Sequence, residues 1–140
     1  MTEDLAGDDP FVYNPAIVFS LGADRDIAAG INANLQYAGT ARLKDGGIGS
    51  ALDIEYGTDA FSSTLTAVVY QRLFRDKFEW TLRALWGLQD RDCYLLPGLS
   101  WTEGDAELKL TAGIFAGDRS GDLGQYRNSS YLKLTLKYTF

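Results

Sequence analysis

The residues of this chain that could do chemistry are few, and none of its 140 residues is a histidine. Asp53 and Glu55 alternate onto one face of a predicted strand, and paired carboxylates can share general acid–base work. The usual base that activates a serine nucleophile is a histidine, so that route is missing. We therefore interpret Asp53 and Glu55 as charges of a lumen, balanced by Arg72, Arg83 or Lys109, and predict no catalysis.

Metal-binding and phosphate-binding patterns are also missing from the sequence. Cys93 is the single cysteine, so no internal disulfide can form, and the scattered carboxylates lack the spacing of metal ligands. The run "GDRSGDLG" has no Walker lysine and no predicted helix after it, which indicates a hairpin loop. We predict no metal and no cofactor, and interpret Cys93 as a small filler near the start of a strand.

The pattern that recurs along the chain is an alternation of apolar and polar residues with period two, which is typical of strands with two different faces. It predicts eight strands of about ten residues each, over residues 11–21, 27–38, 48–57, 61–74, 78–88, 93–102, 106–116 and 131–140. Short polar connections such as "DRD", "TDA", "RDK" and "EGD" join them. Residues 1–10 are predicted to be an acidic disordered segment, and residues 11–140 a single barrel domain.

Two all-β folds fit this alternation. In a soluble barrel the apolar face would be the interior, whereas in a membrane barrel it would meet lipid while the charges line the lumen. Strands of about ten residues match a tilted bilayer crossing, and the small residues of the polar face suit a narrow lumen. We therefore predict an eight-stranded antiparallel up-and-down transmembrane β-barrel. A soluble β-barrel that binds a small apolar ligand is the alternative.

The membrane interpretation gives roles to three sets of residues. A charged network would face the lumen: Asp53, Glu55, Tyr70, Arg72, Glu79, Arg83, Glu107, Lys109, Lys133 and Lys137. Aromatic girdles would lie at the two membrane interfaces: Tyr37, Tyr56, Phe78, Trp80, Trp86, Trp101, Tyr138 and Phe140. The fifth-last, third-last and last positions resemble the C-terminal assembly signal of bacterial outer-membrane proteins: Leu136, Tyr138 and Phe140.

The interior of a closed eight-stranded barrel is about wide enough for side chains to fill. Ions buried there are tolerated only when they pair, so we expect a lumen plugged by salt bridges. The alternatives are a narrow ion path and an association of copies into a wider pore in which each sheet stays open. The short turns "RDK" and "EGD" and both termini would face the periplasm, and "ADRD", "TDA", "QDRD" and residues 117–130 the outside. Residues 39–47 fit this scheme poorly, because they would form a long periplasmic turn.

Bulk properties exclude several classes. The net charge of −6 and the lack of a basic stripe argue against nucleic acid as a partner. No stretch approaches the roughly 18 consecutive apolar residues of a transmembrane helix. The N-terminus, "MTEDLAGDDP", has neither the basic nor the apolar region of a signal peptide.

The last third of the chain resembles the C-terminal end of large proteobacterial porin-like barrels of the alginate-export and DUF1302 types. The residues that carry the resemblance are Asp92, Tyr94, Pro97, Trp101, Gly113–Gly117 with Asp118, Gly124–Tyr126 and Tyr138–Phe140. Residues 14–39, "NPAIVFSLGADRDIAAGINANLQYAG", resemble an upstream stretch of the same group. Members of that group are about three times longer, with more strands, and pore width depends on strand number.

We therefore expect a structural or weakly pore-forming barrel of a Gram-negative outer membrane, a minimal or engineered version of a larger porin-like protein. A porin that conducts through a wider oligomeric barrel is the first alternative. The expected partners are the lipid bilayer or detergent, and the outer-membrane assembly machinery through the C-terminal strand. A monomer is expected, with an oligomer as the alternative.

Overall fold

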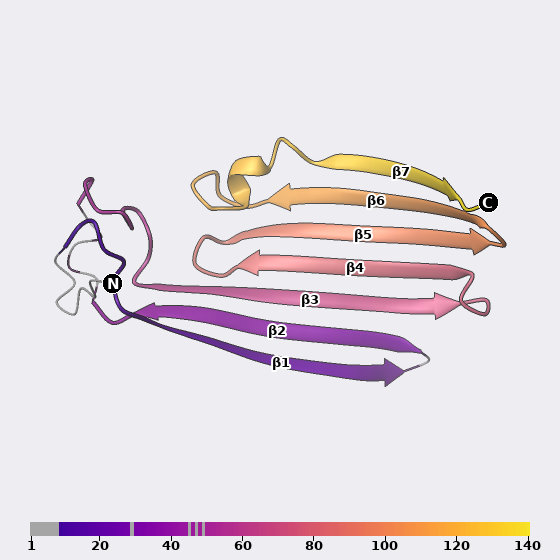
Figure 1. The fold of residues 1–140 in the computed structure, drawn as a ribbon, viewed down its shortest axis with the longest axis horizontal. Helices are drawn as coiled ribbons and strands as arrows, with labels where there is room; N and C mark the ends of the chain where they lie inside the picture. Colours follow the sequence, from indigo (N-terminus) through magenta and orange to yellow (C-terminus); the bar gives the residue numbers. More distant parts are fainter. Residues whose placement is uncertain (1–8, 29, 45, 47, 49) are drawn as a thin grey trace. The chain divides into compact units, whose positions relative to one another are not determined.

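The structure is a computed structural model that describes residues 9–28, 30–44, 46, 48 and 50–140. Most of the predicted disordered N-terminal segment, residues 1–8, lies outside the described residues. The strands form one antiparallel up-and-down sheet in chain order (Figure 1). They are β1 (Ala16–Ala28), β2 (Ile31–Arg42), β3 (Phe61–Leu73), β4 (Phe78–Gly87), β5 (Asp92–Glu103), β6 (Ala106–Ala116) and β7 (Tyr131–Tyr138), with a 3₁₀ helix η1 (Gly124–Tyr126) before β7.

The chain divides into two compact units. The first unit contains residues 1–20 and 38–63, which include the connection between β2 and β3. The second unit contains residues 21–37 and 64–140, which include all of β4 to β7. The second unit carries the larger share of the sheet, and the first carries most of the irregular chain.

The sheet has seven strands and is not closed into a barrel, so β1 and β7 are its two edges. The third of the eight predicted strands, over residues 48–57, is wrong, because residues 50–57 form turns and bends. Asp53 Oδ1 accepts a hydrogen bond of 2.7 Å from the backbone N–H of Glu55, and Gly57 has φ of +78°. Such local side-chain-to-backbone bonds favour turns over the hydrogen-bond ladder of a sheet. The alternation of apolar and polar residues here therefore does not correspond to a strand.

The boundaries of the first hairpin also differ from the prediction. Residues 11–15 are not in a strand, and β1 runs on through the predicted turn at residues 24–26. Asn32 Nδ2 donates to Asp24 Oδ1 at 3.1 Å and to Asp26 Oδ1 at 3.2 Å. These cross-strand bonds give the carboxylates a place in the sheet despite the turn preference of Asp. β2 begins directly after Gly30, whose φ is +75°.

The strands β3 to β7 lie within one or two residues of their predicted bounds, and their register confirms the predicted faces. Leu82 of β4 lies opposite Val69 of β3 and Pro97 of β5, and Leu110 of β6 lies opposite Leu99 and Leu134. Directly opposed residues share a face, so one face of β3–β7 is apolar. The other face carries the charged and hydroxyl side chains.

The connections of the second unit lie at the two ends of its strands. Up-and-down topology puts residues 88–91 and 117–130 at one end. The connections β3–β4 and β5–β6 lie at the other end, which we call the short-turn end, together with the C-terminal end of β7 (Figure 1). The prediction that "ADRD" forms a connection is wrong, because residues 23–26 lie within β1. In the segment 39–47, which fits the predicted scheme poorly, residues 39–42 belong to β2.

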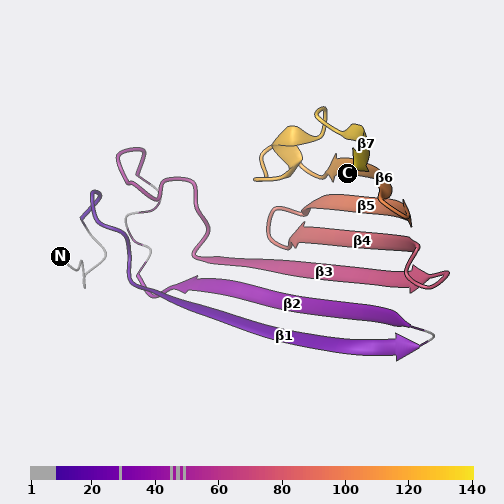
Figure 2. The same ribbon diagram turned by 45° about the vertical axis from the view of Figure 1, so that its right-hand side comes forward.

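The apolar face is not covered by a hydrophobic core in the part of the chain that the structure describes. Among the described residues, Ile48 is the only buried apolar side chain. In contrast, Leu134 and Leu136 of β7 are 67% and 74% exposed, and Trp86 of β4 is 53% exposed. The described residues contain no helix long and apolar enough to cross a membrane. A view turned by 45° shows β6 and β7 foreshortened against β4 and β5, so the sheet twists and curls across these four strands (Figure 2).

Candidate functional site

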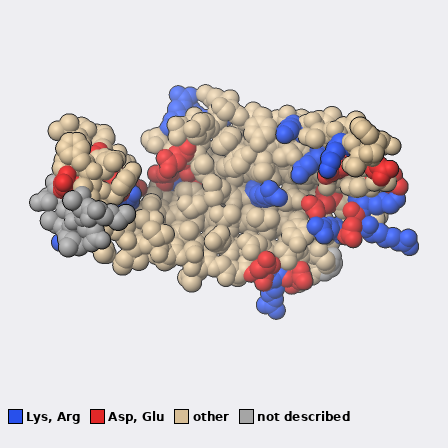
Figure 3. All heavy atoms as spheres, in the orientation of Figure 1, with Lys and Arg blue, Asp and Glu red and all other residues tan. Residues whose placement is uncertain are grey.

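The polar face of β4 to β7 brings together most of the residues predicted to face a lumen. Its rows of opposed residues run across the strands and combine charged residues with small ones. One row holds Thr81, Gly98, Thr111 and Lys133, and the next holds Glu79, Ser100, Lys109 and Thr135. Figure 3 shows charged side chains on this face of the sheet, many of them toward the short-turn end.

This face is hollowed. A depression of about 380 Å³ is lined by side chains of β4, β5, β6 and β7. Its lining combines three cations, one carboxylate, hydroxyl residues, two leucines and a glycine: Glu79, Thr81, Arg83, Leu96, Gly98, Leu99, Ser100, Lys109, Thr111, Tyr131, Lys133 and Thr135. Small residues lie at its centre, because Gly98 has Thr81 and Thr111 directly opposite on the two neighbouring strands. The polar face is therefore the concave one in this part of the sheet.

The charges of the hollow are not balanced. Glu79 Oε2 accepts a hydrogen bond of 2.9 Å from Arg72 Nε, so its charge is already compensated. Arg83, Lys109 and Lys133 form no ion pair with any residue that the structure describes. The salt-bridge plug predicted for the lumen is thus represented in this hollow by the single pair Arg72–Glu79, and the hollow keeps a positive excess.

Three further predicted lumen residues, Tyr70, Glu107 and Lys137, lie at the short-turn end of the same face. Glu107 of β6 is directly opposite Lys137 of β7, an arrangement of opposite charges that favours strand pairing. Tyr70 lies beside Arg72, whose guanidinium carbon is 5.8 Å from the centre of the tyrosine ring. These residues extend the polar face but do not line the hollow.

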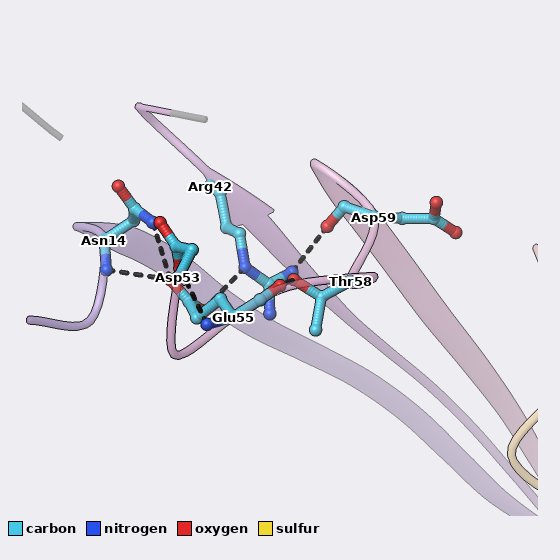
Figure 4. Close-up of polar contacts among 6 residues, drawn as sticks. All are labelled: Asn14, Arg42, Asp53, Glu55, Thr58 and Asp59. Atoms are coloured by element: carbon cyan, nitrogen blue, oxygen red, sulfur yellow. Dashed lines mark hydrogen bonds and ion pairs between the residues drawn. The ribbon is translucent and has the colours of Figure 1, made fainter. Parts of the chain in front are cut away.

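Asp53 and Glu55 lie elsewhere, in the connection between β2 and β3, and the partners predicted for them on the strands are wrong. Glu55 is only 7% exposed. Its Oε1 accepts a hydrogen bond of 2.8 Å from Arg42 Nε, and its Oε2 accepts bonds of 2.8 Å from both the backbone N–H and Nδ2 of Asn14 (Figure 4). Arg42 Nη1 also donates to the carbonyl of Asp59 at 2.6 Å. This buried carboxylate ties the connection to the chain before β1 and to the end of β2.

The environment of Glu55 shifts its acidity. Burial by itself raises the pKa of the Glu55 carboxyl, but the hydrogen bonds from Arg42 and Asn14 outweigh it, so that the pKa lies below the ordinary value of 4.5. Glu55 therefore stays ionised and is a structural anchor. Sequence reasoning could not find this role, since its partners Asn14 and Arg42 are distant in the chain.

Most of the aromatic residues predicted as girdles lie near strand ends, but Tyr37 and Tyr56 do not. At the short-turn end Phe78 and Trp101 have ring centroids 6.3 Å apart, and Phe74 lies 6.3 Å from Trp101. Trp80 is on the same face, and its Nε1 donates to Gln71 Oε1 at 3.0 Å. Trp86 lies at the opposite end of β4, one residue before its last residue, and Tyr37 lies within β2. Tyr56 is in the β2–β3 connection and not in a strand.

The three residues of the proposed C-terminal signal lie at the C-terminal end of the edge strand β7, two within it and one just beyond it. Leu136 and Tyr138 lie opposite Leu108 and Ala106 on the apolar face of β6. Phe140 follows the end of β7, and its ring stacks on Tyr138 with centroids 6.2 Å apart. All three side chains are exposed, so they remain available to a partner.

Metal-ligating groups, Cys93 and the glycine-rich run are the other features that the sequence analysis singles out. The described residues contain no cluster of three or more Cys, Asp or Glu side chains that could hold a metal ion. Cys93 is free and half-buried near the start of β5. The run "GDRSGDLG" belongs to the β6–β7 connection, as predicted, and the three-residue 3₁₀ helix η1 begins at its last residue, Gly124. Asp92 accepts the backbone N–H groups of Leu123 and Gly124 at 2.6 and 3.0 Å, which fixes this connection against the β4–β5 hairpin.

Comparison with protein-family models, curated proteins and solved structures gives no match for this chain. The assignment of a function therefore depends on the two faces of the sheet and on the hollow.

Proposed function

We propose that this sheet is a wall of a transmembrane β-barrel in the outer membrane of a Gram-negative bacterium. The apolar face would meet lipid, and the polar face would line the lumen. Structural or pore-forming work, without catalysis, suits such a wall. Closure would come from further strands along the edges β1 and β7.

One observation carries the proposal. The apolar face is exposed and the hollow lies on the polar face, which is the reverse of a soluble barrel, whose apolar side chains fill its interior. A soluble chain of this length would bury a core, and a continuous exposed apolar face marks a surface that meets a partner or a membrane. The strands support this too, because β1 to β6 have 10 to 13 residues and a tilted bilayer crossing takes about 9–11.

A matched pair of substitutions tests the proposal. Val68 and Val69 are neighbours in β3, but Val68 lies opposite Arg83 on the polar face and Val69 lies opposite Leu82 on the apolar face. Arginine facing lipid near the membrane centre costs about 2–4 kcal/mol. Arginine opposite Arg83 on the wet face costs less than about 1 kcal/mol. We expect Val69→Arg to abolish most insertion into liposomes, measured by protease protection, and Val68→Arg to insert as the unchanged chain does.

Two results would contradict the membrane-wall proposal. If both variants insert equally, or if the unchanged chain is a soluble monomer without detergent, the sheet is not a membrane wall. The second outcome would favour the soluble ligand-binding barrel.

A conducting pore is a second candidate function, and the hollow favours it over a lumen filled by side chains. Its lining includes Gly98 and the small hydroxyl residues Thr81 and Ser100, which leave room for water. Large ohmic steps in planar-bilayer recordings would support a pore through a wider barrel. Silence would support a scaffold role.

A further inference from the structure

The hollow on the polar face has the chemistry of an anion site. Arg83 stands on β4 at one side, and Lys109 and Lys133 stand on β6 and β7 at the other. Lys133 lies opposite Thr111, two residues from Lys109. Diagonal neighbours of this kind are about 7–8 Å apart, so their two ammonium groups can hold one oxyanion between them.

The surroundings leave these cations available. The nearest carboxylate of the hollow, Glu79, is held by Arg72 at 2.9 Å. The central residues Ser100 and Thr111 offer hydroxyl donors to an anion, whereas the hydroxyl of Thr81 donates to Glu79 Oε1 at 3.2 Å. Because the whole chain has a net charge of −6, general attraction does not draw anions to it, and binding would come from this local excess.

We propose that the hollow binds an oxyanion solute with at least two negatively charged groups, one held between Lys109 and Lys133 and the other by Arg83. A guanidinium binds phosphate or carboxylate groups through paired hydrogen bonds, and an ammonium binds them as a point charge. A volume of about 380 Å³ is within the range of small-molecule sites. The assignment of this site to a lumen rests on the proposed function, but the binding itself does not.

The test is calorimetric titration of the refolded chain, in uncharged detergent micelles, with sodium pyrophosphate. We expect saturable binding of one pyrophosphate per chain, and inorganic phosphate to bind about tenfold more weakly, since it loses one set of charged hydrogen bonds. The variant Arg83→Gln/Lys109→Gln/Lys133→Gln should lose at least about a hundredfold in affinity.

Two variants distinguish the site from general effects. Arg75→Gln/Arg119→Gln/Arg127→Gln removes the same charge from exposed positions outside the hollow, and should bind within about twofold of the unchanged chain. Gly98→Val keeps all three cations but fills the centre. A Cβ at Gly98 would meet only ordinary contacts, the nearest being the carbonyl of Leu110 at 3.8 Å, so the strand should fold and affinity should fall at least about tenfold.

No saturable binding by the unchanged chain, or equal losses in the two triple variants, would overturn the anion site. The titration is made in micelles, so its outcome is separate from liposome insertion. Pyrophosphate binding without liposome insertion would support the anion site and contradict the membrane-wall proposal. Insertion without binding would support the membrane wall and contradict the anion site.

Discussion

At the scale of single residues, Glu55 shows how burial changes the worth of an ion pair. The pair Arg42–Glu55 has side chains 13% and 8% exposed, whereas Lys77–Glu103 has side chains 47% and 61% exposed. Exposed pairs contribute about 0–1 kcal/mol, but removing one partner of a buried pair costs about 3–5 kcal/mol. Glu55 is therefore the residue on which the β2–β3 connection depends most.

Acid should release this connection. A carboxyl whose pKa is lowered on folding contributes stability above its unfolded pKa, and that contribution is lost as the pH falls through the folded pKa. For Glu55 the loss therefore begins below the ordinary value of 4.5. We expect hydrogen-exchange protection of residues 50–60, corrected for intrinsic rates, to be constant from neutral pH to about pH 5 and to fall at lower pH.

The variant Glu55→Gln should lower this protection already at neutral pH and remove its acid dependence, because Arg42 is left without its carboxylate. Glu103→Gln is the matched control in an exposed pair and should leave the profile unchanged. An acid step that persists in Glu55→Gln would assign it to another carboxyl.

At the scale of elements, the β6–β7 connection is held by one carboxylate. Asp92 begins β5, is only 1% exposed, and accepts two backbone N–H groups at the start of η1. Glycine is required at Gly117, whose φ is +122°, and at Gly121, since a Cβ at either position would collide with Asp92. The long loop is thus folded onto the β4–β5 hairpin.

Asp92→Ala should free this loop without opening the sheet. Hydrogen bonds to a charged acceptor contribute about 1.5–3 kcal/mol each, so we expect trypsin to cleave after Arg119 and Arg127 at least about tenfold faster. Asp122→Ala, at an exposed position of the same loop, should be cleaved at the original rate. Equal rates in Asp92→Ala and the unchanged chain would mean that the ring contact of Tyr126 with Phe115, 5.7 Å between centroids, holds the loop instead.

The elements that the sequence predicted well are the strands in which apolar and polar residues alternate regularly, because this alternation alone assigns each residue to a face. β6 has the predicted bounds, and the alternating apolar residues Leu95, Pro97 and Leu99 of β5 lie opposite apolar residues of β4. The failures have long-range causes. Asp24 and Asp26 stay in a strand because Asn32 bonds them, and Glu55 leaves the sheet because Asn14 and Arg42 bind it. The hollow was equally unpredictable, since it depends on how four strands curl together.

At the scale of the whole molecule, the number of strands limits how the sheet can close. In an up-and-down sheet of seven strands the first and the last strand run in the same direction, as the arrows of β1 and β7 show (Figure 1). Bacterial barrels of one chain have an even number of antiparallel strands. Closing this sheet on itself would need a parallel pair, so an all-antiparallel barrel takes an odd number of further strands between β1 and β7.

The chain alone should therefore keep β1 and β7 apart. Six strand spacings of about 4.8 Å separate the edges by roughly 29 Å along the sheet, and curling shortens this only in part. We would place spin labels at Leu21→Cys in β1 and Leu132→Cys in β7, in a Cys93→Ser background diluted with unlabelled chain. The expected distance in micelles lies beyond about 20 Å. Labels on the opposed residues Leu95 and Ile114 supply the short reference distance. If the edge labels came as close as this reference pair, the seven strands would close by a parallel pair, and the wall would need no further strands.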